Sequence, residues 1–227
     1  MLHWPHVTRE RPKVMVTMAA AADRWTTGPA EPGRAGPAAR PPRRCHGSLD
    51  AITDSERRAL RPITITAHDV AVRTGALLAE LLTLPGVRIF QGVRSAVADL
   101  PRIPHAISIG RQVLLVESVA WPAGRYATTP AGRIHCDGLY IGQSVRPLLA
   151  AIWLWREALP RGHLVSALVI VHPSADGEIT LPAAAGPDVA WARAADAMRY
   201  IREQLPPGQP PVSIGAVAAL AAAVEIR

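Results

Sequence analysis

The stretch IPHAISIGRQVLLVESVAW, residues 103–121 of the 227-residue chain, decides the fold. Its first half alternates isoleucines with smaller or polar residues, the two-residue period of a β-strand with one buried face, and an apolar run begins at Val113. Between them, Gly110 and Arg111 fit a two-residue turn, because glycine tolerates the positive φ of its first position. The stretch therefore predicts a β-hairpin, with Glu117 near the end of its second strand.

Apolar patterns on either side of the hairpin predict four helices and two further strands. The helices cover residues 68–82, 144–159, 188–205 and 214–225, and the strands cover 87–93 and 164–171. The second of these strands is almost entirely apolar, as strands buried on both faces are. Residues 121–137 contain glycines, prolines and polar residues without a period, which indicates a long loop. Together these elements predict an α/β fold.

Composition divides the chain into a basic tail and a folded part. Residues 1–62, rich in proline, alanine and arginine, are predicted to be disordered, because such a segment buries too little apolar surface to fold. Residues 63–206 are predicted to form the α/β domain, and 207–227 an Ala-rich C-terminal helix capped by Ser213. The first 44 residues hold eight Lys/Arg against three Asp/Glu, or +5 of the total +7, so the high pI is not evidence of DNA binding.

Cysteine content and hydropathy bear on where the protein acts. Cys45 and Cys136 are the only cysteines, too few for a disulfide framework. The longest apolar runs are shorter than the eighteen residues that a membrane span needs, and no segment has the pattern of a signal peptide. We therefore expect a cytoplasmic protein that does not enter a membrane.

The hairpin resembles the core of the nuclease-related domain, NERD, a branch of the PD-(D/E)XK nuclease superfamily. In that family the first strand carries Ile-Asp-His, and the second ends in Glu-Thr-Lys, followed by an aromatic residue and a glycine. The corresponding residues here are Ile103-Pro104-His105 and Glu117-Ser118-Val119, with Trp121 and Gly124 after them. Upstream, the Gly-Glu that opens a helix in the family corresponds to Gly75-Ala76.

The resemblance spans roughly residues 68–172 and implies a PD-(D/E)XK, restriction endonuclease-like core, a central mixed sheet flanked by helices. Nucleases of this superfamily hold Mg²⁺ with several carboxylates and use a lysine beside the attacking water. Here Ala76, Pro104 and Val119 occupy the positions of the partners of Glu117. The resemblance therefore implies a vestigial Glu117, no cofactor, and a catalytically inactive domain that serves as a binding or scaffolding module, with nucleic acid as the inherited ligand.

Two other functions stay open at this point. One is a divergent metal-dependent nuclease, in which Glu117 and Asp137 hold Mg²⁺ and an arginine replaces the lysine. The other is a protein-interaction module without a role in nucleic-acid binding. Inward-pointing side chains of Trp121, Arg125 and Tyr126 would favour this last alternative.

Five residues are candidates for binding. Trp121, Arg125 and Tyr126 lie in a glycine-containing segment and are of the types that stack on bases and pair with phosphates, although the same types also fix a loop to its own domain. His105 fits either a packed core histidine or a ligand-binding residue. Gln143 lies just before a predicted helix, where backbone N–H groups can bind an anion or be capped.

Overall fold

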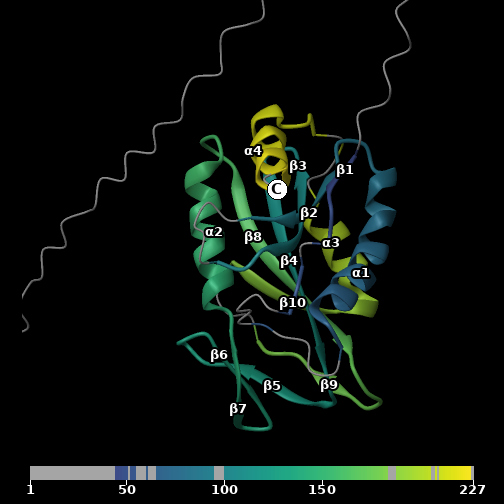
Figure 1. Cartoon of the computed structure of the whole chain (residues 1–227), viewed down its shortest axis with the longest axis vertical. Helices are drawn as coiled ribbons and strands as arrows, with labels where there is room; N and C mark the ends of the chain where they lie inside the picture. The colour runs from purple at the N-terminus through teal and green to yellow at the C-terminus, as the bar shows by residue number, and fades with distance from the viewer. Residues whose placement is uncertain are drawn as a thin grey trace, which may run out of the picture. The chain divides into compact units, whose positions relative to one another are not determined.

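A six-stranded mixed sheet forms the centre of the computed structural model (Figure 1). The structure describes residues 44–50, 52–54, 60, 65–94, 100–183, 188–205, 208 and 210–225. The strand order is β1-β2-β3-β4-β8-β10, with bounds Cys45–Gly47, Arg88–Val93, Ile103–Ile109, Gln112–Trp121, Leu164–Pro173 and Val189–Arg193. Strand β3 is antiparallel to both β2 and β4, whereas β8 is parallel to both β4 and β10. The predicted mixed sheet flanked by helices is confirmed.

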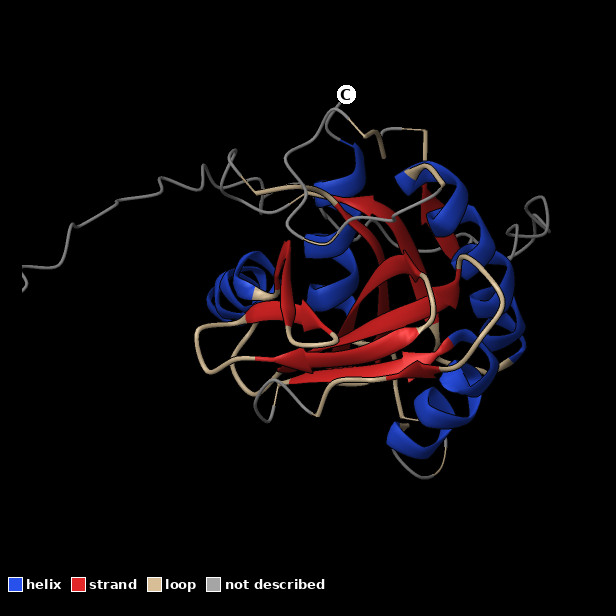
Figure 2. Cartoon of the chain, turned by 90° about the horizontal axis from the view of Figure 1, so that it is seen from below, coloured by secondary structure: helices blue, strands red, loops and turns tan. Residues whose placement is uncertain are grey.

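Helices cover both faces of this sheet (Figures 1 and 2). One face packs against α1 (Ala67–Leu78), the 3-10 helix η1 (Ala79–Thr83) and α3 (Ala194–Gln204), and the other against α2 (Arg146–Ala158) and α4 (Ile214–Glu225). Within β4, Leu115 and Val119 belong to the core on the α2 side, and Val116 to the core on the α1 side. All seven residues of β3 are buried, so the expectation of one buried face was wrong. The reason is that the sheet is sandwiched between two helical layers.

The hairpin itself is confirmed. Strands β3 and β4 pair up to Ile109 and Gln112, which leaves Gly110 and Arg111 as a two-residue connection. Gly110 has a φ of +55°, in the left-handed region that glycine populates without a steric penalty. The turn is also crowded, because a Cβ added at Gly110 would lie 2.9 Å from the Cβ of Pro210.

Replacing Gly110 with valine should therefore destabilise the domain far more than replacing Arg111 with alanine. A β-branched residue at a positive φ is strained by about 1 to 3 kcal/mol, and the contact with Pro210 adds to that cost. Replacing the exposed Arg111 with alanine should lower the free energy of unfolding by less than about 0.5 kcal/mol. Urea unfolding of both variants measures the difference, and equal small losses would show that the turn does not need glycine.

Three sequence-based assignments need correction. Residues 188–205 were predicted to be one helix, but 189–193 form β10, because pairing with β8 overrides the local helical pattern. The predicted loop 121–137 contains β5 and β6. In the predicted helix 144–159 the apolar pattern groups Trp153 with Leu149 and Ile152, but Trp153 is 61% exposed and Trp155 is buried. The strands at 87–93 and 164–171 are confirmed.

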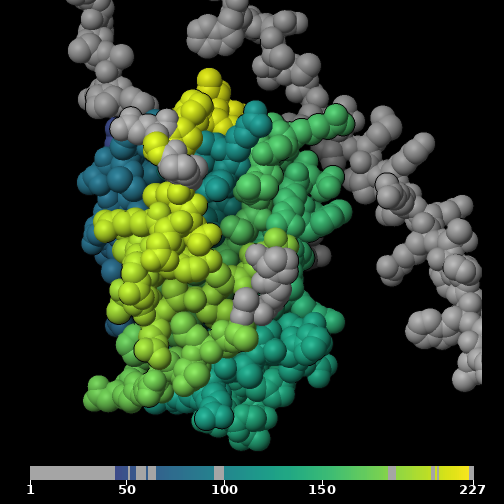
Figure 3. All heavy atoms as spheres, turned by 180° about the vertical axis from the view of Figure 1, so that it is seen from behind, coloured from purple at the N-terminus to yellow at the C-terminus, as the bar shows by residue number. Residues whose placement is uncertain are grey.

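A second, four-stranded sheet lies at one end of the first, below α3 in the view from the back (Figure 3). Its order is β7-β6-β5-β9, with bounds Leu139–Ser144, Arg133–Cys136, Gly124–Thr128 and Ile179–Thr180. Strands β5, β6 and β9 are two to five residues long, too short for a sequence period to emerge, and only one of the six residues of β7 is buried. Asp137 and Gly138, both at positive φ, form the turn between β6 and β7.

The domain boundaries also differ from those predicted. Strand β1, within the predicted tail, pairs with β2, and Leu60 is buried. Helix α4 is part of the main core, with Ala216 and Leu220 fully buried. Its predicted cap is confirmed, since Ser213 Oγ accepts a hydrogen bond from the N–H of Ala216 (3.3 Å). Residues 42–227 form one compact unit, whereas the predicted disorder of residues 1–43 lies outside the described residues.

Among the described helices, none combines the length and the apolar character needed to cross a membrane.

Candidate functional site

Glu117 lies in a closed environment on the α2 side of β4. Its side chain is 5% exposed and lines a recess of about 20 Å³ together with Ser144 and Pro147. The backbone N–H of Ser118 donates to Glu117 Oε1 (3.1 Å). A volume of this size holds about one water molecule, so the phosphate of a substrate does not fit beside this carboxylate.

The positions that surround Glu117 supply no metal ligands. Because His105 pairs with Val116, the register places Pro104 opposite Glu117. Val119 is buried on the same face, but Ala76 is exposed on α1, which covers the other face. Ala76, which corresponds to the helix glutamate of the family, therefore lies across the sheet from Pro104 and Val119.

Asp137, the second ligand of the nuclease alternative, belongs to the small sheet and not to the sheet of Glu117. Its Oδ1 accepts from the backbone N–H of Arg125 (3.0 Å), and its own N–H donates to Arg125 O (2.9 Å). The carboxylate thus stabilises the turn between β6 and β7. Within the described part of the chain, no three His, Cys, Asp or Glu side chains form a group able to hold a metal ion.

Trp121, Tyr126 and Gln143 form a buried cluster between the two sheets. The rings of Trp121 and Tyr126 stack at 4.1 Å with an interplanar angle of 10°, and neither residue is more than 2% exposed. Trp121 Nε1 donates to Gln143 Oε1 (3.0 Å), and Tyr126 Oη donates to Pro122 O (3.0 Å). Burial and the neighbouring Cys136 raise the pKa of Tyr126, so its phenol stays neutral. These three residues join the sheets and do not present a binding surface, which corrects the prediction. Of Trp121, Arg125 and Tyr126, only Arg125 is exposed, so two of these three side chains meet the inward-pointing condition of the protein-interaction alternative.

His105 is a core histidine, fully buried on the face of the sheet that α1 covers. Neither of its ring nitrogens is hydrogen-bonded to any residue that the structure describes. Burial lowers its pKa to about 4, so the imidazole is neutral at pH 7. Helix α1 comes close at Gly75, where an added Cβ would lie 3.1 Å from His105 Nε2.

A chain of hydrogen bonds on the same face joins three buried side chains that sequence reasoning missed. Ser118 Oγ donates to Thr74 Oγ1 (2.9 Å), which lies 2.8 Å from His172 Nε2. Burial, together with the charge of Arg73, lowers the pKa of His172 to about 4. A neutral imidazole carries one N–H donor and one acceptor nitrogen, so the direction of the bond between Thr74 and His172 follows the tautomer of His172. These residues are 44 and 98 positions apart, and no local pattern could have brought them together.

The outer face of the small sheet carries four exposed or partly exposed side chains, Arg125, Arg133, His135 and Tyr140. Tyr140 is 52% exposed and pairs with His135 across β6 and β7, with their ring centroids 5.8 Å apart. The guanidinium carbon of Arg133 lies 5.7 Å from the centre of the Tyr140 ring. His135 Nδ1 lies 3.2 Å from Gly138 O, a hydrogen bond that holds the imidazole in place. The ring of Tyr140 is therefore exposed to solvent and lies next to the guanidinium of Arg133 and the imidazole of His135.

Arg146, at the first position of α2, extends this basic surface. A Cβ added at Gly132 would lie 3.2 Å from Arg146 Cγ, so Arg146 packs directly beside the residue that precedes Arg133. Arg125, Arg133 and Arg146 are all exposed, and Asp137 is the acidic side chain in contact with this part of the sheet. The region is therefore locally positive on a domain whose net charge is small. Of its residues, sequence reasoning identified only Arg125 as a binding residue.

Comparisons of this chain with protein-family models, with curated proteins and with solved structures find no match.

Proposed function

We propose that this domain binds single-stranded nucleic acid through the outer face of the small sheet, Arg125, Arg133, His135 and Tyr140, together with Arg146. The observation that carries the proposal is the exposed Tyr140 ring with Arg133 above it at 5.7 Å and His135 beside it at 5.8 Å. An exposed aromatic ring on a sheet stacks on an unpaired base, and nearby arginines pair with the phosphates on either side of that base.

Single strands fit this surface better than duplexes. A base buried in a duplex stack does not offer its face to a tyrosine, whereas an unpaired base does. The three arginines lie on β5, on β6 and at the start of α2, so they follow the surface and do not converge on one point. That arrangement suits a flexible sugar-phosphate chain that passes over a stacking platform.

The order of elements supports a PD-(D/E)XK-like core for the domain. Helix α1 is followed by strands β2, β3 and β4, with β3 antiparallel to its two neighbours, then by the small-sheet strands β5, β6 and β7, and then by helix α2 and strand β8, which is parallel to β4. Apart from the small sheet, this is the order of helix, three strands, helix and strand that the resemblance implies. With such a core, with Pro104 opposite Glu117 and with a closed recess at the carboxylate, we propose that the domain binds nucleic acid without cutting it.

Fluorescence anisotropy with labelled 12-nucleotide RNA and DNA tests this proposal on the full-length chain. Tyr140→Ala should weaken binding about 5- to 150-fold, the effect of losing one stacked base. Arg133→Ala should weaken binding of all sequences alike and reduce the slope of log K against log salt by about 0.7. Both side chains are exposed, so neither variant should change stability by more than about 0.5 kcal/mol.

Arg161→Ala is the matched control, because it removes an exposed arginine from the loop between α2 and β8, outside the small sheet. It should bind as the natural chain does. Absence of binding to single strands and duplexes at low salt would overturn the proposal and favour the protein-interaction alternative. Binding that Tyr140→Ala and Arg133→Ala leave unchanged would place the interface elsewhere.

A further inference from the structure

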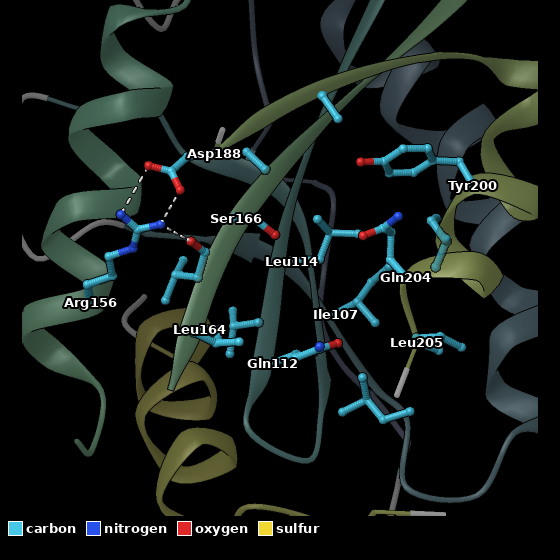
Figure 4. A pocket seen from close by; sticks show the side chains of 16 residues that line it. Ile107, Gln112, Leu114, Arg156, Leu164, Ser166, Asp188, Tyr200, Gln204 and Leu205 are labelled. Carbon is cyan, nitrogen blue, oxygen red and sulfur yellow. Dashed lines mark hydrogen bonds and ion pairs between the residues drawn. The ribbon is translucent and has the colours of Figure 1, made fainter. Parts of the chain in front are cut away.

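A pocket of about 280 Å³ opens between α3 and the first residues of β4 and β8 (Figure 4). Its walls are aliphatic: Ile107 and Leu114 come from the sheet, and Ile201 and Leu205 from the end of α3. The small sheet contributes none of its residues, so this pocket is separate from the proposed nucleic-acid surface. Ligand pockets in proteins have volumes on the order of 300 to 1,000 Å³, so this pocket is close to the lower end of that range.

Four neutral polar side chains line the same pocket. They are the hydroxyls of Tyr200 and Ser166 and the amides of Gln112 and Gln204. In Figure 4, Tyr200 and Gln204 extend from α3 toward Ser166 and Leu114. None of the four side-chain polar groups is hydrogen-bonded to another residue among those that the structure describes. They are therefore available to a ligand, and each amide offers a donor and an acceptor side by side.

The charged residues at the pocket neutralise each other. Arg156 and Asp188 form a two-point ion pair with distances of 3.1 and 2.5 Å, and Arg156 also donates to Val165 O (2.7 Å). They are the only charged side chains among the residues that line the pocket. An anionic ligand would find no unpaired cation, and a cationic ligand no unpaired carboxylate. The pocket is thus matched to an uncharged ligand.

We propose that this pocket binds an uncharged nucleobase or nucleoside. A base is flat and apolar on its faces, which suits the aliphatic walls of the sheet and of α3. Its edge carries hydrogen-bond donors and acceptors side by side, and one glutamine amide can bind a donor and an acceptor of that edge at the same time. Gln204 and Gln112 would bind this edge, and the hydroxyls of Tyr200 and Ser166 would form hydrogen bonds with the other polar groups of the ligand.

Equilibrium dialysis of the full chain against adenosine, guanosine, cytidine and uridine, each alone, tests the proposal. One of them should bind saturably with a Kd below about 1 mM. Gln204→Leu and Tyr200→Phe should each weaken binding about fivefold or more, because each removes a hydrogen bond. The 5′-monophosphate should bind no more tightly than its nucleoside. Arg161→Ala again serves as the control that changes nothing.

Three results would overturn the assignment. They are the absence of saturable binding by all four nucleosides, a monophosphate that binds tenfold more tightly than its nucleoside, and binding that Tyr140→Ala removes while Gln204→Leu does not. The last result would place the nucleoside on the small sheet, so it would refute this pocket and support the proposed function. Circular dichroism of the Tyr200→Phe and Gln204→Leu variants, expected to match the natural chain, shows that lost binding is not lost folding.

Discussion

The free energy of unfolding should fall by about 3 kcal/mol for each of His105 and His172 as the pH is lowered from 6.5 to 4. Burial holds the pKa of both imidazoles at about 4 in the folded chain, against 6.5 when unfolded. Between these values the unfolded chain binds more protons than the folded one, so stability declines with falling pH. The stability that each neutral histidine contributes is fully present above pH 6.5. It is lost as the pH falls from 6.5 to 4, and it no longer changes below about pH 4. Each pKa unit corresponds to about 1.4 kcal/mol.

Urea unfolding at several pH values measures this effect, and two variants assign it. His105→Leu should remove about half of the pH dependence and change stability at pH 7 little, because no described residue is hydrogen-bonded to the ring. His172→Gln retains a hydrogen-bond partner for the Thr74 hydroxyl and should remove the other half. Arg73→Gln should shift the His172 window to higher pH, because the positive charge of Arg73 lowers that pKa. A double variant with the pH profile of the natural chain would show that other groups control acid stability.

Trp121→Ala should lower the free energy of unfolding by about 3 to 5 kcal/mol, the usual cost of truncating a fully buried tryptophan. The change removes the ring that stacks on Tyr126 at 4.1 Å and the hydrogen bond from Nε1 to Gln143. Because Trp121 also contacts Trp191, the loss affects both sheets at their junction. Chemical denaturation followed by circular dichroism measures the change.

Trp153→Ala is the matched control for this prediction, since it removes the same side chain from a site that is 61% exposed. It should cost less than about 0.5 kcal/mol. Trp121→Phe should fall between the two, because it keeps a ring but loses the indole N–H. If Trp121→Ala left stability unchanged and weakened nucleic-acid binding, Trp121 would be a surface residue, as the sequence had indicated.

The sequence predicts the four central strands of the large sheet, β2, β3, β4 and β8, because these strands are six to ten residues long and largely apolar. The seven residues of β3 and ten of β4 contain enough positions to establish a pattern, and Gly110 marks the turn between them. Periodicity does not report how many helical layers cover a sheet, and for this reason the second buried face of β3 was missed. It also fails for strands of five residues or fewer, such as β10 and β6.

The candidate site shows a different limit of sequence reasoning. Aromatic residues and arginines within one segment suggested a binding loop, yet Trp121 and Tyr126 point into the junction between the sheets. Tyr140 and Arg133, seven residues apart, meet only because β6 and β7 pair with a bulge at Ile134 and His135. Whether an aromatic residue binds a partner or holds the fold together depends on which face of a short strand it occupies. The pairing of the strand in the folded chain determines this face, and the amino-acid composition of the segment does not.

The packing of α4 has a consequence for how the chain matures. This last described helix covers β1 and β2, the first strands to be made, with Val224 close to Gly47 and the N–H of Arg94 bonded to Ala223 O (3.2 Å). Until residues 214–225 are synthesised, Phe90 and Val93 lack the cover that α4 gives them, although they share a cluster with earlier residues such as Leu60 and Ile103. The nascent chain therefore exposes part of this apolar face until nearly all of the described residues have emerged, and apolar surface exposed during folding is prone to aggregation.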